Sequence, residues 1–268
     1  MKFVYSTDLH GNKKKYEDVF GFAIEHNVDL IHLGADLLPK GSSILKEQKQ
    51  FIRGYLKVFY DRCREKGITV LAMFGNDDLV SRKKYFKDYA TLLDEAVYLR
   101  DGYAFSGYPF VPDYPFGLKS NCKLDHDRWV MPEAQLGRPV DVGPDGFVPI
   151  LDLEGYFKAK GTIEADLKLL KGGDKAVVAM HCPPCGLGLD VCDGNRRVGS
   201  KSIMEWIERE KPLLVLSGHI HESYECSKIW KANIGDTTVI QPGQGTFETH
   251  MVYIEINGRL VSADLVIK

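Results

Sequence analysis

The chain has 268 residues, of which 35 are basic and 37 acidic, so its formal net charge is −2. An apolar share of 44% and a charged share of 27% are typical of a globular protein and exclude a disordered chain. Unbroken apolar runs reach only about five residues, far short of the roughly 18 that span a bilayer, and the balanced charge disfavours a general nucleic-acid coat.

A strand is predicted at once, over Phe3–Ser6. No long apolar segment and no small-residue cleavage site accompany it, so we expect a cytoplasmic protein whose six cysteines are reduced. Apolar residues at helical spacing then predict a helix over 16–24 and a longer one over 51–63 that ends near Gly67.

Strands and helices alternate along most of the chain. Further strands are predicted at Val28–Leu33, Ile68–Phe74, Lys175–Met180 and Leu213–Ser217, with a helix near Lys201–Glu210. This alternation predicts an α/β fold with a largely parallel sheet. We expect residues 1–268 to form a single domain.

Two regions break the alternation. Seven of the twelve prolines lie between Pro109 and Pro149, where periodicity is weak. Residues of about 109–160 are therefore predicted to form an insertion that caps a site or makes a homodimer contact. Near the C-terminus, Thr238–Ile240, Met251–Ile256 and Leu260–Ile267 predict antiparallel strands, and the Asn257-Gly258 turn joins the last two.

Polar side chains follow five of the predicted strands, at the sheet edge where α/β proteins bind ligands. Because alternate residues of extended backbone point the same way, Asp8 with His10, and His219 with His221, are each expected to reach one point. Carboxylate, imidazole and amide groups at these strand ends predict a set of metal ligands: Asp8, His10, Asp36, Asn76, His181, His219 and His221.

Seven mixed oxygen and nitrogen ligands exceed what one ion needs. They predict two ions, with Mn, Fe or Zn favoured over Ca or Mg. Two such ions clamp the attacking and leaving oxygens of an in-line displacement. With only Asp8 and Asp36 as carboxylates, the loaded site stays positive and attracts an anion such as phosphate.

The order and spacing of these motifs resemble the calcineurin-like metallophosphoesterase superfamily, whose pattern is D-x-H, G-D, G-N-H-[DE], H and G-H-x-H. The matching segments are Asp8-Leu9-His10, Gly34-Ala35-Asp36, Gly75-Asn76-Asp77-Asp78, His181 and Gly218-His219-Ile220-His221. The resemblance implies a four-layer α/β/β/α sandwich and hydrolysis by a metal-bound hydroxide. It also implies that Asp8, His10 and His221 bind one metal, that Asn76, His181 and His219 bind the other, and that Asp36 bridges them.

Two positions depart from the family pattern. Ala35 is inserted between the glycine and the aspartate of G-D. Asp77 stands where the family has a histidine that is credited with protonating the leaving group. Two hypotheses follow: Asp77 is an acid of raised pKa, or the role is lost and good leaving groups are favoured.

Arginines near the site add a predicted phosphate contact. Arg196 and Arg197 lie in the glycine-flanked loop 194–199 that follows His181, and arginine binds phosphate with two hydrogen bonds. The sequence therefore predicts a metal-dependent hydrolase of a phosphate mono- or diester, small molecule or nucleotide, without a membrane partner. The alternatives are a nuclease of the same superfamily, which lysines at 13–15 favour slightly, and a non-catalytic metal-binding or scaffold module.

Overall fold

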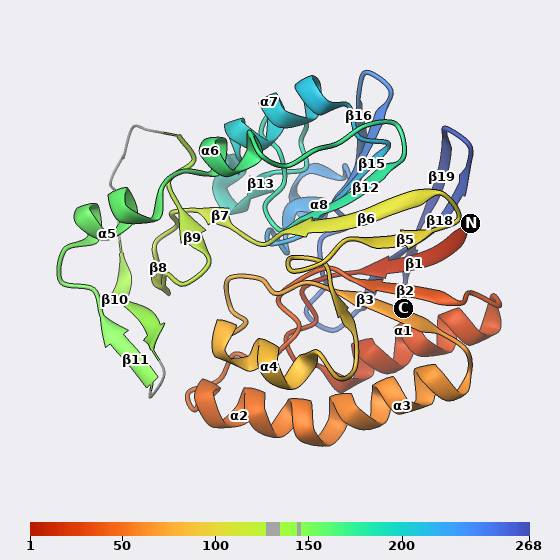
Figure 1. Cartoon of the computed structure of the whole chain (residues 1–268), viewed down its shortest axis with the longest axis horizontal. Coiled ribbons are helices and arrows are strands. Elements are labelled where there is room, and N and C mark those ends of the chain that lie inside the picture. The colour runs from red at the N-terminus through yellow and green to blue at the C-terminus, as the bar shows by residue number, and fades with distance from the viewer. Residues whose placement is uncertain (127–134, 144–145) are drawn as a thin grey trace.

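The computed structural model describes residues 1–126, 135–143 and 146–268. Two six-stranded sheets pack face to face, and helices cover their outer faces (Figure 1). The layers run helix, sheet, sheet, helix, which confirms the predicted α/β class and the four-layer sandwich. Within these ranges, no helix combines the length and the hydrophobicity that a membrane crossing requires.

The first sheet has the order β19-β18-β1-β2-β3-β4. Strands β1 to β4 run parallel, and β18 is antiparallel to β1. The strands β1, β2 and β3 are short and almost wholly buried because both of their faces are covered, as the unbroken apolar runs predicted. The bounds are β1 Lys2–Ser6, β2 Leu30–Leu33, β3 Thr69–Ala72, β4 Thr91–Leu92, β18 His250–Asn257 and β19 Leu260–Ile267.

The second sheet has the order β16-β17-β15-β12-β6-β5. It meets the first sheet through large rings: those of Phe3 and Phe105 pack edge to face with centroids 5.6 Å apart. The bounds are β5 Tyr98–Arg100, β6 Tyr103–Tyr108, β12 Ala176–Met180, β15 Leu214–Ser217, β16 Lys231–Ile234 and β17 Thr237–Ile240.

Helices on the side of the first sheet are α1 Lys13–Glu25, α2 Ile44–Phe51, α3 Lys57–Glu65 and α4 Lys83–Phe86, and α6 Ile163–Leu167 and α7 Lys201–Glu210 cover the second (Figure 1). A shorter helix, α8, spans Ser223–Ser227. The predicted long helix is α2 and α3 joined by a π-helical turn at Ile52–Leu56. Helix α7 has the predicted bounds.

The C-terminal prediction is right for the β18–β19 hairpin and wrong in part for β17. Strand β17 is antiparallel to β16 but parallel to β15, so it belongs to the second sheet rather than to a C-terminal antiparallel unit. All four residues of β17 are buried. A fully buried strand has no alternation of polar and apolar residues, so its sequence does not tell which neighbours it pairs with.

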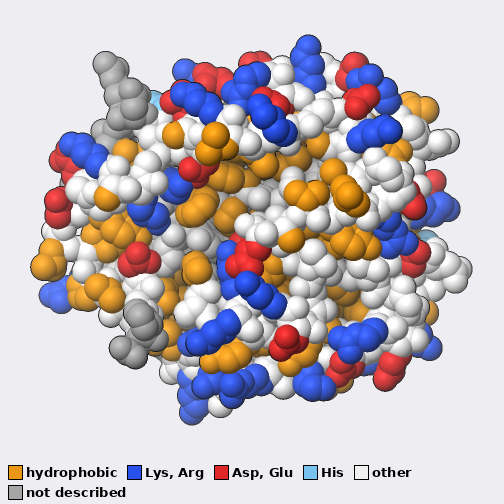
Figure 2. Space-filling view, viewed as in Figure 1, with side chains coloured by type: hydrophobic (Ala, Val, Ile, Leu, Met, Phe, Trp, Pro, Cys, Tyr) orange, Lys and Arg blue, Asp and Glu red, His pale blue; other side chains and the backbone are white. Residues whose placement is uncertain are grey.

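The insertion forms short strands where the sequence suggested little regular structure. It holds β7 Val111–Pro112, β8 Phe116–Leu118, β9 Cys122–Lys123, β10 Leu136–Gly143, β11 Gly146–Pro149 and α5 Leu153–Lys160. Strands β11, β10 and β8 make a three-stranded sheet at the left of Figure 1. In the same region, Figure 2 shows hydrophobic side chains between groups of both charges. Residues 127–134 and 144–145 lie outside the described part of the insertion.

A buried histidine between the sheets leads to a prediction on acid stability. His32 is fully buried beside the rings of Phe3, Tyr5 and Phe105, and neither ring nitrogen has a hydrogen-bond partner among the residues that the structure describes. Burial lowers the pKa of His32 to about 3. The unfolded chain takes up a proton at this residue below about pH 6.5, and the folded chain does not until about pH 3.

Between these pH values, His32 is expected to lower the free energy of unfolding by about 1.4 kcal/mol per pH unit as the solution becomes more acidic. The free energy of unfolding of His32→Leu minus that of the wild type should therefore be about 2.5 kcal/mol larger at pH 4.5 than at pH 7.5. Urea unfolding at the two pH values measures this gain. The matched control is His26→Leu, at an exposed histidine. Equal pH dependence of the wild type and His32→Leu would refute the prediction.

Candidate metal centre

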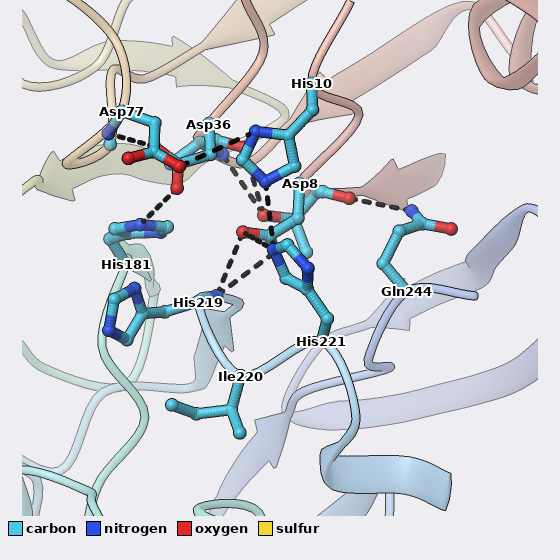
Figure 3. A network of polar contacts seen from close by, with 12 residues as sticks. Asp8, His10, Asp36, Asp77, His181, His219, Ile220, His221 and Gln244 are labelled. Atoms are coloured by element: carbon cyan, nitrogen blue, oxygen red, sulfur yellow. Dashed lines mark hydrogen bonds and ion pairs between the residues drawn. The ribbon is translucent and has the colours of Figure 1, made fainter. Parts of the chain in front are cut away.

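Six of the seven predicted ligand residues lie together where the carboxyl ends of strands from both sheets meet (Figure 3), and the seventh, Asn76, contacts His181. Asp8 and His10 follow β1, Asp36 follows β2, and Asn76 follows β3. His181 follows β12, and His219 and His221 follow β15. The sequence predicted these residues at the edge of one parallel sheet. In the structure they follow strands of two sheets, as the four-layer sandwich requires.

Strained backbone holds four of these residues. Asp8, His10, Asp36 and His219 have φ values of 56°, 43°, 49° and 70°, in the left-handed region that side chains other than glycine rarely adopt. Such strain costs about 1–3 kcal/mol per residue and concentrates at functional sites. The prediction that His219 and His221 point to one place is wrong, because the left-handed turn at His219 breaks the extended backbone on which it depended.

The side chains form two adjoining groups, and within each group the donor atoms lie within 4.8 Å of one another. One group consists of Asp8, His10 and His221, and the other of Asp36, His181 and His219. In the first group, the Nε2 atoms of His10 and His221 are 2.9 Å apart, and His221 Nε2 is 3.6 Å from Asp8 Oδ1.

In the second group, His181 Nε2 lies 3.3 Å from Asp36 Oδ2 and 2.9 Å from Oδ1 of Asn76. The ring centroids of His181 and His219 are 4.9 Å apart. Asn76 therefore joins this group through its amide oxygen. A third group, of His10, Asp36 and Asp77, overlaps the other two.

Burial and mutual charge set the ionisation of these groups. Burial alone would raise the pKa of Asp8, but the hydrogen bond and charge of His221 bring it down to about 2. Burial would likewise raise the pKa of Asp36, but the charge of His181 holds it well below its usual range. Burial lowers the pKa of His10 to about 4 and that of His219 to about 3. Burial opposes the charged form of His181 as well, but the charge and hydrogen bond of Asp36 raise its pKa to about 9. Near neutral pH, Asp8 and Asp36 are thus ionised, His10 and His219 are neutral, and His181 is protonated.

Asp77, the departure from the family pattern, lies in the site beside a lysine that the sequence argument missed. Burial, followed by the charge of Asp36, raises the pKa of Asp77 to about 6. Lys40 Nζ is 3.6 Å from Asp77 Oδ2 and 3.3 Å from His10 Nε2. The role of Asp77 as an acid stays a prediction. Lys40 lies outside the motifs, seven residues beyond β2, so only the folded chain brings it here.

Asp78 is a second residue whose role only the structure reveals. It is fully buried, and its carboxyl oxygens accept hydrogen bonds from the backbone N–H groups of Leu37, Leu38 and Gly75, at 3.1, 2.8 and 3.0 Å. These bonds tie the loop that carries Asp36 to the loop that carries Asn76. From the insertion, Asn121 Nδ2 donates to Gly75 O at 2.7 Å.

Close packing explains two of the motif glycines. A Cβ atom on Gly75 would overlap Oδ1 of Asp36, and one on Gly218 would overlap Oδ2 of Asp8. The inserted Ala35 links the first two loops, because its carbonyl accepts from Asp8 N at 2.8 Å and its N–H donates to Oγ1 of Thr7 at 3.2 Å. Asp36 thereby keeps its place at the strand end despite the added residue.

The two arginines face different surroundings. They form the short strand β14 Arg196–Arg197, paired with β13 Val191–Cys192. Neighbouring residues of a strand point to opposite faces. Arg196 lines the cavity at the candidate metal centre, whereas Arg197 Nη1 lies 3.5 Å from Oδ1 of the buried Asp190.

Two cavities open onto the candidate ligands. One, of about 570 Å³, is lined by Asp36, Asn76, Asp77 and His219 and by apolar residues of the insertion. The other, of about 1030 Å³, is reached from Asp8 and His10 and carries several acidic side chains, including Glu47, Glu225 and Glu248. His221, Lys40 and Glu222 line both. The site is therefore reached from two adjoining cavities.

The donor set fits divalent metal ions. Asp8 and Asp36 are buried carboxylates that face imidazole nitrogens at 3.3–3.6 Å, and buried charges require a partner or a metal. In the described ranges, Nδ1 of His10 and of His181 is buried without a hydrogen-bond partner. Mixed carboxylate, imidazole and amide donors suit first-row transition metals. The fold and the site thus define an α/β protein with a candidate metal centre between two sheets.

Comparison with known proteins gives the family. The calcineurin-like phosphoesterase family matches residues 1–223, and the chain belongs to this family, which is metal-dependent. A search of curated protein sequences finds no match.

Solved structures agree on the fold. The protein TT1561 of Thermus thermophilus is 17% identical over 98% of this chain and 97% of its own, with a TM-score of 0.53. The calcineurin-like phosphoesterase YfkN from Bacillus subtilis is 10% identical over 100% of this chain and 90% of its own, with a TM-score of 0.50. At these identities the likeness concerns the fold alone.

Proposed function

We propose that the protein hydrolyses a phosphate mono- or diester with two divalent metal ions, of which Mn, Fe and Zn fit best. The observation that carries this proposal is the pair of adjoining groups, Asp8-His10-His221 and Asp36-His181-His219, in a chain of this family. Three of their members, Asp36, His219 and His221, line the smaller of the two cavities. The cavity volume of about 570 Å³ suits a small phosphate ester or a nucleotide.

Each group would hold one ion. Asp8, His10 and His221 would hold the first, Asn76, His181 and His219 the second, and Asp36, which belongs to two of the three donor groups, would lie between them. When bound, the ions supply an activated water and positive charge for the phosphoryl group. The insertion would cap the site, since Asn121 hydrogen-bonds to Gly75 O and Phe116 lines the cavity.

The surrounding side chains would position the ester. Lys40 would place its ammonium group beside the phosphoryl oxygens, because its Nζ already lies within 3.6 Å of His10 and Asp77. Arg196, which lines the same cavity, would bind the same anion.

The test is a panel of phosphate mono- and diesters assayed with Mn, Mg, Zn and Fe after chelation. We expect no hydrolysis in the chelated protein and recovery with at least one transition metal. Metal analysis distinguishes the scaffold alternative from the enzyme. A scaffold would hold less than about half an equivalent of transition metal after purification with Mn supplied. A preference for oligonucleotides over every small ester would favour the nuclease, although the net charge of −2 disfavours it.

The two arginines provide a matched pair of variants. Arg196→Ala is expected to raise KM for a phosphate ester about tenfold with little change in kcat, because it removes one charge-assisted contact to the bound anion. Arg197→Ala is the control and should stay within about twofold, since Arg197 pairs with Asp190 instead. Steady-state kinetics of both variants check the prediction. Equal effects would contradict the assignment of Arg196 to the site.

A further inference from the structure

One wall of the 570 Å³ cavity is apolar, and the insertion builds most of it. We call this the apolar wall; it consists of Tyr114, Pro115, Phe116, Leu136, Val198 and Ile220. Its residues come from four separate stretches of the chain. Ile220 lies between the two histidines of the last motif and is turned away from the carboxylates (Figure 3).

Two large side chains of the wall are exposed although they stand next to each other. Phe116 in β8 is 42% exposed and Leu136 in β10 is 63% exposed. They are partners in the parallel register, so their side chains lie on the same face of the small sheet. Adjacent exposed apolar groups that line a cavity mark a binding surface more than a packing defect.

Aromatic rings connect this wall to the candidate metal centre. The ring of Tyr114 lies 4.6 Å from that of His219, and the ring of Phe116 lies 6.1 Å from that of Tyr114. Tyr114 is held in place, because its hydroxyl donates to the carbonyl of Val198. The rings therefore form a continuous path from a proposed metal ligand to the exposed Phe116.

The second cavity also has an exposed aromatic side chain, Phe247, but most of its lining is polar or charged. It is larger, and Glu47, Asp193, Glu225 and Glu248, which do not line the first cavity, give it an acidic lining. A ligand ring gains little binding free energy from an acidic surface. On exposed aromatic side chains, the same ring is stabilised by stacking. Of the two openings, the first, with its adjoining apolar side chains, thus suits the organic part of an ester better.

We propose that the apolar wall binds a flat aromatic or heteroaromatic group of the substrate, so that the protein acts on phosphate esters of aryl or nucleobase-bearing alcohols. This inference rests on the proposed function and names its substrate class. The phosphoryl group would lie at the metal centre, Lys40 and Arg196 would face its charge, and the ring would lie against Phe116 and Leu136.

Phosphonates of equal charge test the wall without requiring turnover. Isothermal titration calorimetry with Mn-supplemented protein would compare phenylphosphonate, cyclohexylphosphonate, methylphosphonate and inorganic phosphate. We expect phenylphosphonate to bind about tenfold more tightly than cyclohexylphosphonate, which has a similar size but no ring face. Equal binding of these two, or tighter binding of the cyclohexyl compound, would overturn the inference.

A matched pair of variants assigns the effect to the wall. Phe116→Ala should bring the phenyl and cyclohexyl affinities within about twofold, whereas Phe147→Ala should keep the tenfold preference. Phe147 lies in β11 of the same small sheet, is 43% exposed, and does not line the cavity. A preference that survives Phe116→Ala would also refute the proposal.

The experiment separates the two proposals. If inorganic phosphate binds but the phenyl group adds nothing, the substrate class is wrong and the phosphoesterase proposal stands. If no anion binds to the Mn-supplemented protein, both proposals fall.

Discussion

Asp36→Asn is expected to abolish hydrolysis, with kcat/KM at least about 10³-fold below that of the wild type. The amide has the size of the carboxylate and keeps Oδ1 as acceptor for the backbone N–H of Asp77, which lies 2.8 Å away. It removes, however, one of the two carboxylate charges proposed to hold the ions. The loss would therefore come from metal binding and charge rather than from folding.

Metal analysis and kinetics on one preparation check this expectation. The metal content of Asp36→Asn should fall by at least one equivalent, while its melting temperature without metal should stay close to that of the chelated wild type. Asp236→Asn is the control, because Asp236 is almost fully exposed and far from the candidate ligands in the fold, at the turn between β16 and β17. Full metal content and a full rate in Asp36→Asn would show that Asp36 does not bridge the ions.

Asp78→Ala is expected to have the largest effect on stability, lowering the free energy of unfolding by about 3–5 kcal/mol. The substitution leaves the backbone N–H groups of Leu37, Leu38 and Gly75 buried without acceptors. Each such group costs about 1–3 kcal/mol. Because these bonds hold the loops of Asp36 and Asn76 together, metal affinity should fall as well.

Urea unfolding of the chelated protein measures the stability change without the contribution of bound metal. Asp264→Ala, at an exposed position of β19, is the control and should change the free energy of unfolding by less than about 0.5 kcal/mol. Asp78→Asn should fall between the two, since it keeps one acceptor oxygen. A change below about 1 kcal/mol in Asp78→Ala would show that water or other groups replace the three hydrogen bonds.

The α/β class, most of the central strands and the set of candidate ligands could be predicted from local sequence patterns. Strands such as β12 and helix α7 have strong local patterns, and their bounds agree with the predictions to within about one residue. The ligand residues were recognisable because each follows directly on a strand, so that its position in the fold depends on local structure. The motif order then identified the family.

The grouping of these residues around the site depends on the folded arrangement of the loops. The left-handed backbone at His219 separates it from His221, and no sequence pattern encodes that turn at a residue other than glycine. The pairing of β17 with β15 was equally hidden, because a buried strand has no polar face.

The long-range contacts of the site were also beyond local patterns. Lys40 reaches His10 and Asp77, Asp78 joins two loops about 40 residues apart, and Phe116 meets Leu136 through strand pairing. Each contact depends on packing between segments distant in the chain. Local sequence therefore specified which groups stand at the strand ends, and the packing of two sheets and an insertion specified what surrounds them.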